Sequence, residues 1–129
     1  VVVVGFIGGL QLARSDDDLD DVLVAADAET LRLDGAEGTA RVVWSASEDR
    51  AVLIATGLDA PGSGNAYELW LIDEDGPNPT GLFTPDDDGS VRFELPLEGR
   101  DPAAWGITVE PDTGSDQPTE PILFIGETA

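Results

Sequence analysis

The feature that most constrains the fold of this chain is a succession of short apolar segments separated by turn residues. Such segments recur at residues 29–34, 39–46, 50–58, 66–72, 81–84, 90–97, 104–111 and 121–127. Gly and Pro, often beside Asp or Glu, punctuate the joins between them. Within residues 90–97 apolar and charged residues alternate, as in a strand buried on one face. We therefore predict an all-β fold, a single antiparallel β-sandwich or partly open barrel of about 7–8 strands.

Composition excludes most catalytic chemistry. The chain has 129 residues, 41% of them hydrophobic, which suits one domain with a packed core. It contains no cysteine and no histidine, so thiol nucleophiles, Ser-His-Asp triads and the zinc and copper sites that use these residues are excluded. Ser63 lacks the spacing of a nucleophile elbow, and no carboxylate pair stands out for glycoside hydrolysis. We predict a protein that is not an enzyme and has no cofactor.

The net charge of −21 further limits the possible partners. A surface of this sign repels phosphate backbones and anionic lipid surfaces, so no nucleic-acid partner is expected. All basic residues are arginine. Such a composition is compatible with a halophilic source or with a GC-rich genome, and neither of these is a molecular function.

The N-terminal region divides into two expected segments. Residues 1–12 are apolar without a period, and we interpret them as the C-terminal end of a transmembrane helix; a buried strand is the alternative. Residues 13–28 are rich in Asp and form an expected acidic juxtamembrane linker, exposed and polar, although residues 19–30 could instead form a short helix or strand. The acidic flank favours an extracytoplasmic location for the remainder of the chain. The β-domain is expected at residues 29–129.

Two acidic turns invite a calcium interpretation. The candidate ligands are Asp73 and Asp75 in one turn and Asp86 and Asp88 in the other. An EF-hand loop would require a bidentate Glu at its twelfth position, where these two turns have Thr84 and Leu97. We interpret both as hairpin turns that carry acidic residues, and keep calcium binding as the alternative.

The aromatic residues lie almost entirely within the predicted strands, where such side chains usually fill a core. Trp70 is the exception to examine, because strand alternation can place it on the opposite face of the sheet from its neighbours. An exposed Trp70 would favour a carbohydrate-binding platform.

Three phrases in a fixed order carry a resemblance to a known family. They are GLDAPGSGNAYELWLIDEDGPNPTGLF at 57–83, DDDGSVRFELP at 86–96 and AWGITVEPDTGSDQPTEPILFIG at 104–126. Together they resemble the C-terminal domain of the RskA-type anti-sigma-K factors of bacteria. Thr113 departs from that pattern, which often has Gly there, so the last loop can differ in shape from the family's. The matching residues, interpreted as structural, are Tyr67, Leu69, Trp70, Gly81, Phe83, Glu110, Pro111, Gly114, Ser115, Pro118 and Thr119.

The resemblance implies a regulatory role. A cytoplasmic segment outside this chain would bind an extracytoplasmic-function sigma factor, one transmembrane helix would anchor the protein in the cell membrane, and this domain would lie outside. Processing proteases would cleave in steps and release the sigma factor, and the β-domain would control their access to residues 13–28. The alternative function is that of a secreted or surface-anchored β-sandwich that binds calcium or carbohydrate.

Overall fold

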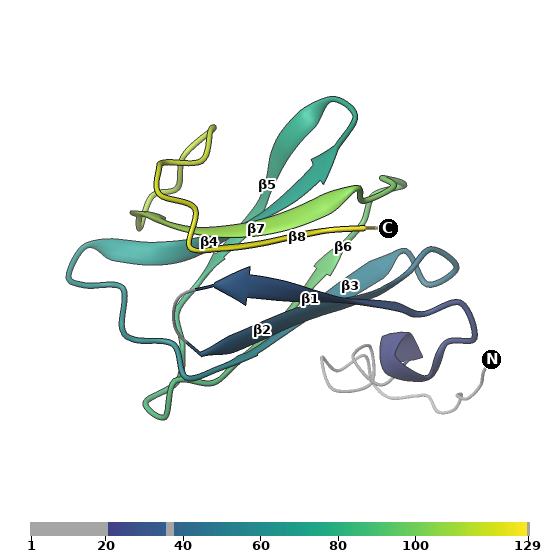
Figure 1. Ribbon diagram of the computed structural model, residues 1–129, viewed down its shortest axis with the longest axis horizontal. Coiled ribbons are helices and arrows are strands. Elements are labelled where there is room, and N and C mark those ends of the chain that lie inside the picture. The colour runs from purple at the N-terminus through teal and green to yellow at the C-terminus, as the bar shows by residue number, and fades with distance from the viewer. Residues whose placement is uncertain (1–20, 36–37, 129) are drawn as a thin grey trace.

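The computed structural model describes residues 21–35 and 38–128. Its elements are all β-strands apart from one helical turn at residues 21–24 (Figure 1). The strands are β1 (Glu29–Gly35), β2 (Thr39–Ser45), β3 (Arg50–Thr56), β4 (Asn65–Asp73), β5 (Gly76–Phe83), β6 (Val91–Pro96), β7 (Ala104–Pro111) and β8 (Phe124–Glu127). The all-β prediction and the expected number of strands are confirmed.

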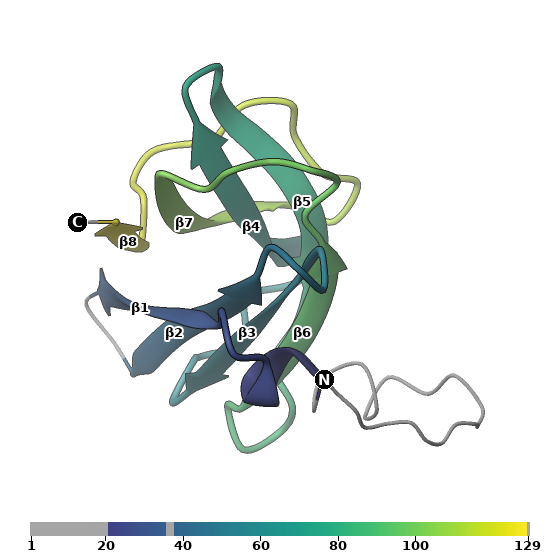
Figure 2. The same cartoon turned by 90° about the vertical axis from the view of Figure 1, so that its right-hand side faces the viewer.

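The strands form one antiparallel sheet in the order β5-β4-β7-β8-β1-β2-β3-β6. Figure 2 shows that this sheet curls on itself into a nearly closed barrel, so the partly open barrel describes the fold and the sandwich does not. Its two halves meet on one side through β8 and β1, which share only the register pairs Asp34↔Ile125 and Gly35↔Phe124. On the other side β5 and β6, the two ends of the strand order, approach each other without pairing.

Side chains close the unpaired seam between β5 and β6. The ring of Phe83 on β5 lies 5.4 Å, centroid to centroid, from that of Phe93 on β6, and 5.6 Å from Tyr67 on β4. A Cβ atom at Gly81 would come within 2.6 Å of the Phe93 ring. Glycine at this position therefore allows the two edge strands to approach. Three of the residues that carry the resemblance therefore pack at this seam: Tyr67, Gly81 and Phe83.

The barrel interior is a continuous apolar core. Its aromatic centre is the pair Trp44 and Trp105, from opposite halves of the barrel, with ring centroids 6.0 Å apart. Both tryptophans are buried, and Leu53, Leu69 and Ile107 beside them have no exposed surface. Burial of side chains of this size supplies the main driving force for folding, at about 25 cal/mol per Å² of apolar surface removed from water.

Strand β5 differs from the prediction. The sequence pattern places a strand at 81–84, whereas β5 spans Gly76–Phe83 and includes Pro77 and Pro79. Prolines cannot donate to a strand ladder, but they are tolerated on an edge strand such as β5. The Asn78 amide donates to the Leu71 carbonyl at 3.1 Å, and the Thr80 hydroxyl donates to the Leu69 carbonyl at 2.7 Å. These side-chain bonds add to the pairing of β5 with β4.

Residues 21–28 pack against the outer face of the barrel before β1 begins. Val22 has no exposed surface and packs with Val43 on β2 and Val52 on β3. This part of the expected linker is therefore less exposed than its polar sequence suggests. The expected transmembrane residues 1–12 lie outside the described residues. Within 21–35 and 38–128 no helix has both the length and the apolar character needed to span a bilayer.

Candidate functional site

The outer face of β4 and β7 carries a buried polar cluster. Tyr67 and Leu69 point into the barrel core, so alternation along β4 sends Glu68 and Trp70 to the outer face. Trp70 is nevertheless only 1% exposed, and Glu68 only 4%. This excludes Trp70 as an exposed platform for carbohydrate. It also indicates that another segment covers this face of the sheet.

The covering segment is the chain that follows β7. Residues 112–123 connect β7 to β8 and pass over the outer face of β4 and β7, as the loop at the upper left of Figure 1 shows. Ile122 lies close to Gly106, the register partner of Trp70 on β7. A Cβ atom at Gly114 would lie 3.6 Å from Leu82 and 4.0 Å from the Glu68 carboxylate. Trp70 and Glu68 are thus enclosed between the sheet and this segment.

A chain of hydrogen bonds runs from Trp70 to Glu110. The indole Nε1 of Trp70 donates to the Thr108 hydroxyl at 2.9 Å, and that hydroxyl donates to Oε2 of Glu110 at 2.5 Å. All three side chains are buried. Thr108 and Glu110 are two residues apart on β7, so they share one face of the strand. A buried polar group needs such partners, because leaving it unsatisfied costs about 1–3 kcal/mol.

Glu110 also holds the covering segment. Its Oε2 accepts a hydrogen bond from the backbone amide of Thr119 at 2.7 Å, and its Oε1 accepts one from the Thr119 hydroxyl at 2.7 Å. Burial raises the pKa of Glu110, but the bonds from Thr108 and Thr119 outweigh burial and lower this pKa to about 2. The carboxylate is therefore ionised and acts as a fixed acceptor that ties the segment to β7.

Glu68 forms a second tie. Its Oε1 accepts a hydrogen bond from the backbone amide of Ser115 at 3.1 Å. Burial raises the pKa of Glu68; the Ser115 amide opposes this shift, and the negative charges of Glu110 and Asp116 add to it. Glu68 and Glu110 thus have opposite pKa shifts, because Glu110 has more donors to compensate its burial.

Glycine and proline shape the segment that these carboxylates hold. Gly114 has a φ of +87°, which L side chains rarely adopt, and its amide donates to the Pro111 carbonyl at 2.8 Å. The amide of Asp112 donates to the Gly64 carbonyl at 3.0 Å and joins the segment to the loop before β4. Pro118 directly precedes Thr119 and is half-buried. We name the cluster formed by Glu68, Trp70, Thr108, Glu110, Ser115 and Thr119 the loop clamp.

The loop clamp brings together residues that the resemblance singled out separately on β4, β7 and the last loop. Glu68 was missed, because an acidic residue inside an apolar strand of an acidic protein gives no distinctive signal. Thr108 lies in the phrase at 104–126 that carries the resemblance, and it was given no role of its own. Its spacing of two from Glu110 was the available indication that the two share a face. The hydrogen bonds of the loop clamp join its side chains to one another and to the backbone of the covering segment, so its geometry is structural.

Two of the four calcium candidates, Asp73 and Asp88, accept hydrogen bonds within their own turns. Asp73 Oδ1 accepts hydrogen bonds from the Asp75 amide at 2.9 Å and from Asn78 at 3.2 Å, and its Oδ2 pairs with Arg100 at 3.0 Å. Asp88 Oδ1 accepts from the amide and the hydroxyl of Ser90 at 3.1 and 2.6 Å. In the part of the chain that the structure describes, no three acidic side chains are grouped as a metal site would require.

Asp27 forms a separate contact on the outer face of β2. It accepts hydrogen bonds from the Ser45 hydroxyl at 2.6 Å and from the amide and the hydroxyl of Ser47, each at 2.9 Å. The Ser45 hydroxyl is the main cause that lowers the pKa of Asp27, and Ser47 adds to the shift. The sequence did not reveal this contact, because one Asp among many in an acidic stretch carries no pattern.

Comparison with known proteins identifies relatives of the whole region. Residues 1–122 match the family model described as "Anti-sigma-K factor rskA, C-terminal". The chain is 38% identical over 131 residues to the anti-sigma-K factor RskA of Mycobacterium sp. (strain KMS), covering 95% of this chain and 52% of that protein. It is 36% identical over 107 residues to the anti-sigma-K factor RskA of Mycobacterium ulcerans, covering 81% and 45%.

A further relative carries no functional name. An uncharacterized protein in the phr 5′ region of Streptomyces griseus is 40% identical over 120 residues, covering 89% of this chain and 49% of that protein. The chain thus spans about half the length of the curated relatives it matches. No solved structure gives a significant match.

Proposed function

This chain belongs to the family of anti-sigma-K factor RskA C-terminal domains, and from this premise we propose that it is the extracytoplasmic regulatory domain of a membrane-anchored anti-sigma factor. The single observation that carries the proposal is the family match over residues 1–122, which includes the apolar N-terminal run and strands β1 to β7 of the barrel. Because the chain spans about half of its relatives, sigma-factor binding is assigned in this proposal to sequence outside it.

The C-terminal end of the membrane anchor is proposed at residues 1–12. This run is apolar, and the acidic stretch after it lacks the Lys and Arg excess of a cytoplasmic flank. A net charge of −21 also keeps the domain away from anionic lipid headgroups by repulsion. These features support a single-pass topology with the barrel on the outer side.

The mechanism that we propose is control of proteolysis. A protease that cuts between the membrane and the barrel would separate the sensing domain from the anchor, and a further cut within the membrane would release the sigma factor. The barrel contributes by determining how accessible residues 13–28 are. Support comes from residues 21–28, which pack on the barrel through Val22 and Asp27 and therefore depend on the folded domain.

The alternative, a calcium- or carbohydrate-binding sandwich, has little support. Trp70 is covered, and Asp73 and Asp88 already accept hydrogen bonds within their turns. Calcium titration followed by the melting temperature tests this alternative, because a specific site stabilises the protein by mass action. We expect calcium to shift the melting temperature no more than magnesium at equal ionic strength. A larger shift that is lost in an Asp73→Asn or Asp88→Asn variant would favour the alternative.

The proposed function is tested in cells with the full-length protein carrying an N-terminal tag. We expect deletion of residues 29–129 to convert the protein constitutively into shorter membrane-bound and soluble fragments and to activate a reporter driven by the cognate sigma factor. An undeleted protein at the same expression level is the control. An intact anchor fragment with a silent reporter would contradict the proposal. Proteolytic cleavage of the undeleted full-length protein only within residues 58–126 would also contradict the proposal.

A further inference from the structure

Two contacts on the outer face of the barrel hold the segment that precedes β1. The first is Val22, which has no exposed surface and packs with Val43 and Val52. These two valines are register partners on β2 and β3, and they face outward because their neighbours Val42 and Leu53 point into the core. Val22 therefore covers apolar surface that would otherwise face water.

The second contact is Asp27. Both of its carboxylate oxygens accept hydrogen bonds from Ser45 and Ser47, at the end of β2 and in the turn after it. The Ser45 side chain is itself buried and also accepts a hydrogen bond from the Glu48 amide at 3.1 Å. The Asp27 carboxylate thus binds donors of Ser45 and Ser47 whose positions are fixed by the β2–β3 turn.

The residues between these contacts are apolar or small, and all of them except the half-buried Ala25 are exposed. Leu23 is 38% exposed and Val24 is 71% exposed. Residues 21–24 are helical, and the Ala28 amide donates to the Ala25 carbonyl at 3.1 Å, so the backbone is compact there. Exposed small and apolar side chains suit many protease subsites, but a protease binds its substrate as an extended strand. Cleavage here requires the segment to leave the barrel first.

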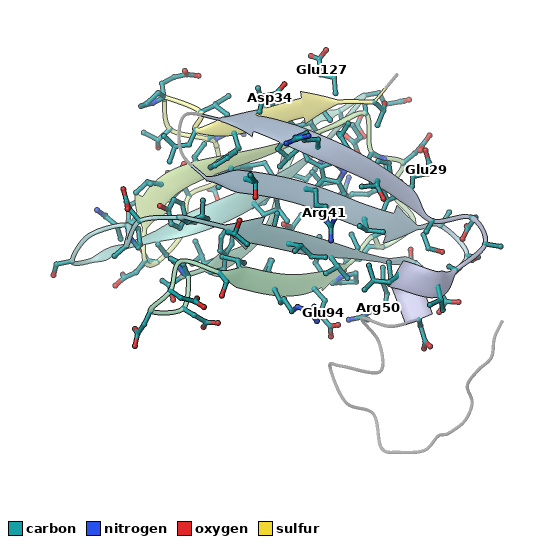
Figure 3. All side chains as sticks on the ribbon, turned by 60° about the horizontal axis from the view of Figure 1, so that its bottom comes forward. Glu29, Asp34, Arg41, Arg50, Glu94 and Glu127 are labelled. Carbon is teal, nitrogen blue, oxygen red and sulfur yellow. The ribbon has the colours of Figure 1, made fainter. Side chains whose placement is uncertain are left out.

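The contacts that hold this segment are separate from the barrel core. Val22, Val43 and Val52 form a cluster separate from the barrel core, and Ala28 and Ile54 pack at its edge. Local opening with a small free energy is typical of segments with few buried apolar contacts. Figure 3 shows the face concerned, with the helical turn lying over the end of the sheet near Arg50.

We propose that the peptide bonds from Leu23 to Ala26 are the regulated cleavage site of this domain, and that Val22 and Asp27 form a clasp whose release from β2 and β3 exposes them. The inference rests on the proposed function and gives it a defined site. The reaction is hydrolysis by a separate protease: water adds across one C–N bond, which leaves a new carboxylate and a new amino terminus. The clasp regulates the reaction through the population of the open segment.

The test is limited proteolysis of the 129-residue chain in mild detergent with a protease of broad specificity. Cut sites are mapped by mass spectrometry. Val22→Asp is the opening variant, and Ala60→Asp, which places the same acidic side chain at an exposed position outside the segment, is the control. We expect Val22→Asp to raise the rate of cleavage within Leu23–Ala26 by about tenfold to a hundredfold, the factor that corresponds to the loss of one buried valine. Ala60→Asp should change the rate less than about threefold.

A milder variant removes only the second contact. Asp27→Asn retains the size of the side chain but replaces one acceptor oxygen by a donor, and we expect an intermediate rise in the same cuts. Equal rates in all variants and the parent chain would overturn the proposal. Cuts spread evenly over the barrel in Val22→Asp, with a lower melting temperature, would also overturn it, because Val22 would then support the whole fold.

The same variants in the full-length tagged protein separate this inference from the proposed function. Suppose that Val22→Asp is cleaved faster in solution but the sigma-dependent reporter is unchanged. This result would support the clasp proposal and contradict the proposed function. Suppose instead that the reporter responds to barrel deletion but not to Val22→Asp, and that cleavage of Val22→Asp in solution is unchanged. This result would support the proposed function and contradict the clasp proposal.

Discussion

The Glu110 carboxylate accepts hydrogen bonds from both the backbone amide and the hydroxyl of Thr119, so one buried carboxylate on β7 fixes a residue nine positions later in the covering segment. The Thr108 hydroxyl supplies a third donor to the same carboxylate. We expect Glu110→Ala to lower the free energy of unfolding by roughly 2–4 kcal/mol, because the buried Thr108 hydroxyl and the two Thr119 donors lose their acceptor. Urea unfolding followed by tryptophan fluorescence measures the loss. Thr113→Ala, an exposed change in the same segment, should be near neutral, and equal effects of the two would contradict the role of Glu110.

The depressed pKa of Glu110 has a defined pH signature. Since folding lowers this pKa from 4.5 to about 2, the ionised carboxylate stabilises the folded state. Its contribution is complete above pH 4.5 and is lost as pH falls through about 2. We expect the parent chain to lose more stability over this interval than Glu110→Gln, which has nothing to protonate there. Parallel stability curves for the two proteins would contradict the assignment.

Glu68 should behave in the opposite way. Burial raises its pKa, so the ionised form is disfavoured in the folded state, and stability from this group increases as pH falls through that raised pKa. Glu68→Gln keeps an oxygen that can accept from the Ser115 amide and removes a charge that Glu110 and Asp116 repel. We expect it to raise stability at neutral pH by on the order of 1 kcal/mol. The gain should shrink at acidic pH, and a constant gain would point to a cause other than ionisation.

The seam between β5 and β6 is tested at Gly81. A Cβ atom there would overlap the Phe93 ring, so we expect Gly81→Ala to cost roughly 1–3 kcal/mol of stability. The double variant with Phe93→Leu should recover part of the loss, because the smaller side chain leaves room for the methyl group. A double-mutant cycle from urea unfolding measures this coupling. Strict additivity would show that the two residues do not meet across the seam.

Local patterns predicted the strands well but could not predict what covers them. Alternation in β6 and the apolar runs of β2, β3 and β7 indicated strands because each has a face in the barrel core. The first half of β5 was missed, since Pro77 and Pro79 argue against a strand unless its position at an edge is known. Edge position is a property of the whole sheet, and no single segment encodes it.

At the candidate site, too, the sequence indicated the face of the strand but not the segment that covers it. Strand alternation correctly put Trp70 on the face opposite its neighbours, but its burial depends on residues 112–123, which come after it by about forty positions. Val22 was hidden for a different reason: one apolar side chain in an acidic stretch forms no periodic pattern. Its partners Val43 and Val52 did show an outward apolar pair, and this pair was the available signal that something docks on β2 and β3.

The order of contacts along the N-terminal segment has a mechanical consequence. Val22 and Asp27 are attached to β2, β3 and the turn between them, whereas β1 starts only at Glu29. Tension applied at the N-terminal end of this segment reaches Val22 first, then Asp27, and only afterwards the ladder between β1 and β2. The contacts of Val22 and Asp27 would therefore break while the barrel stays folded, so the segment would detach under force before the domain unfolds.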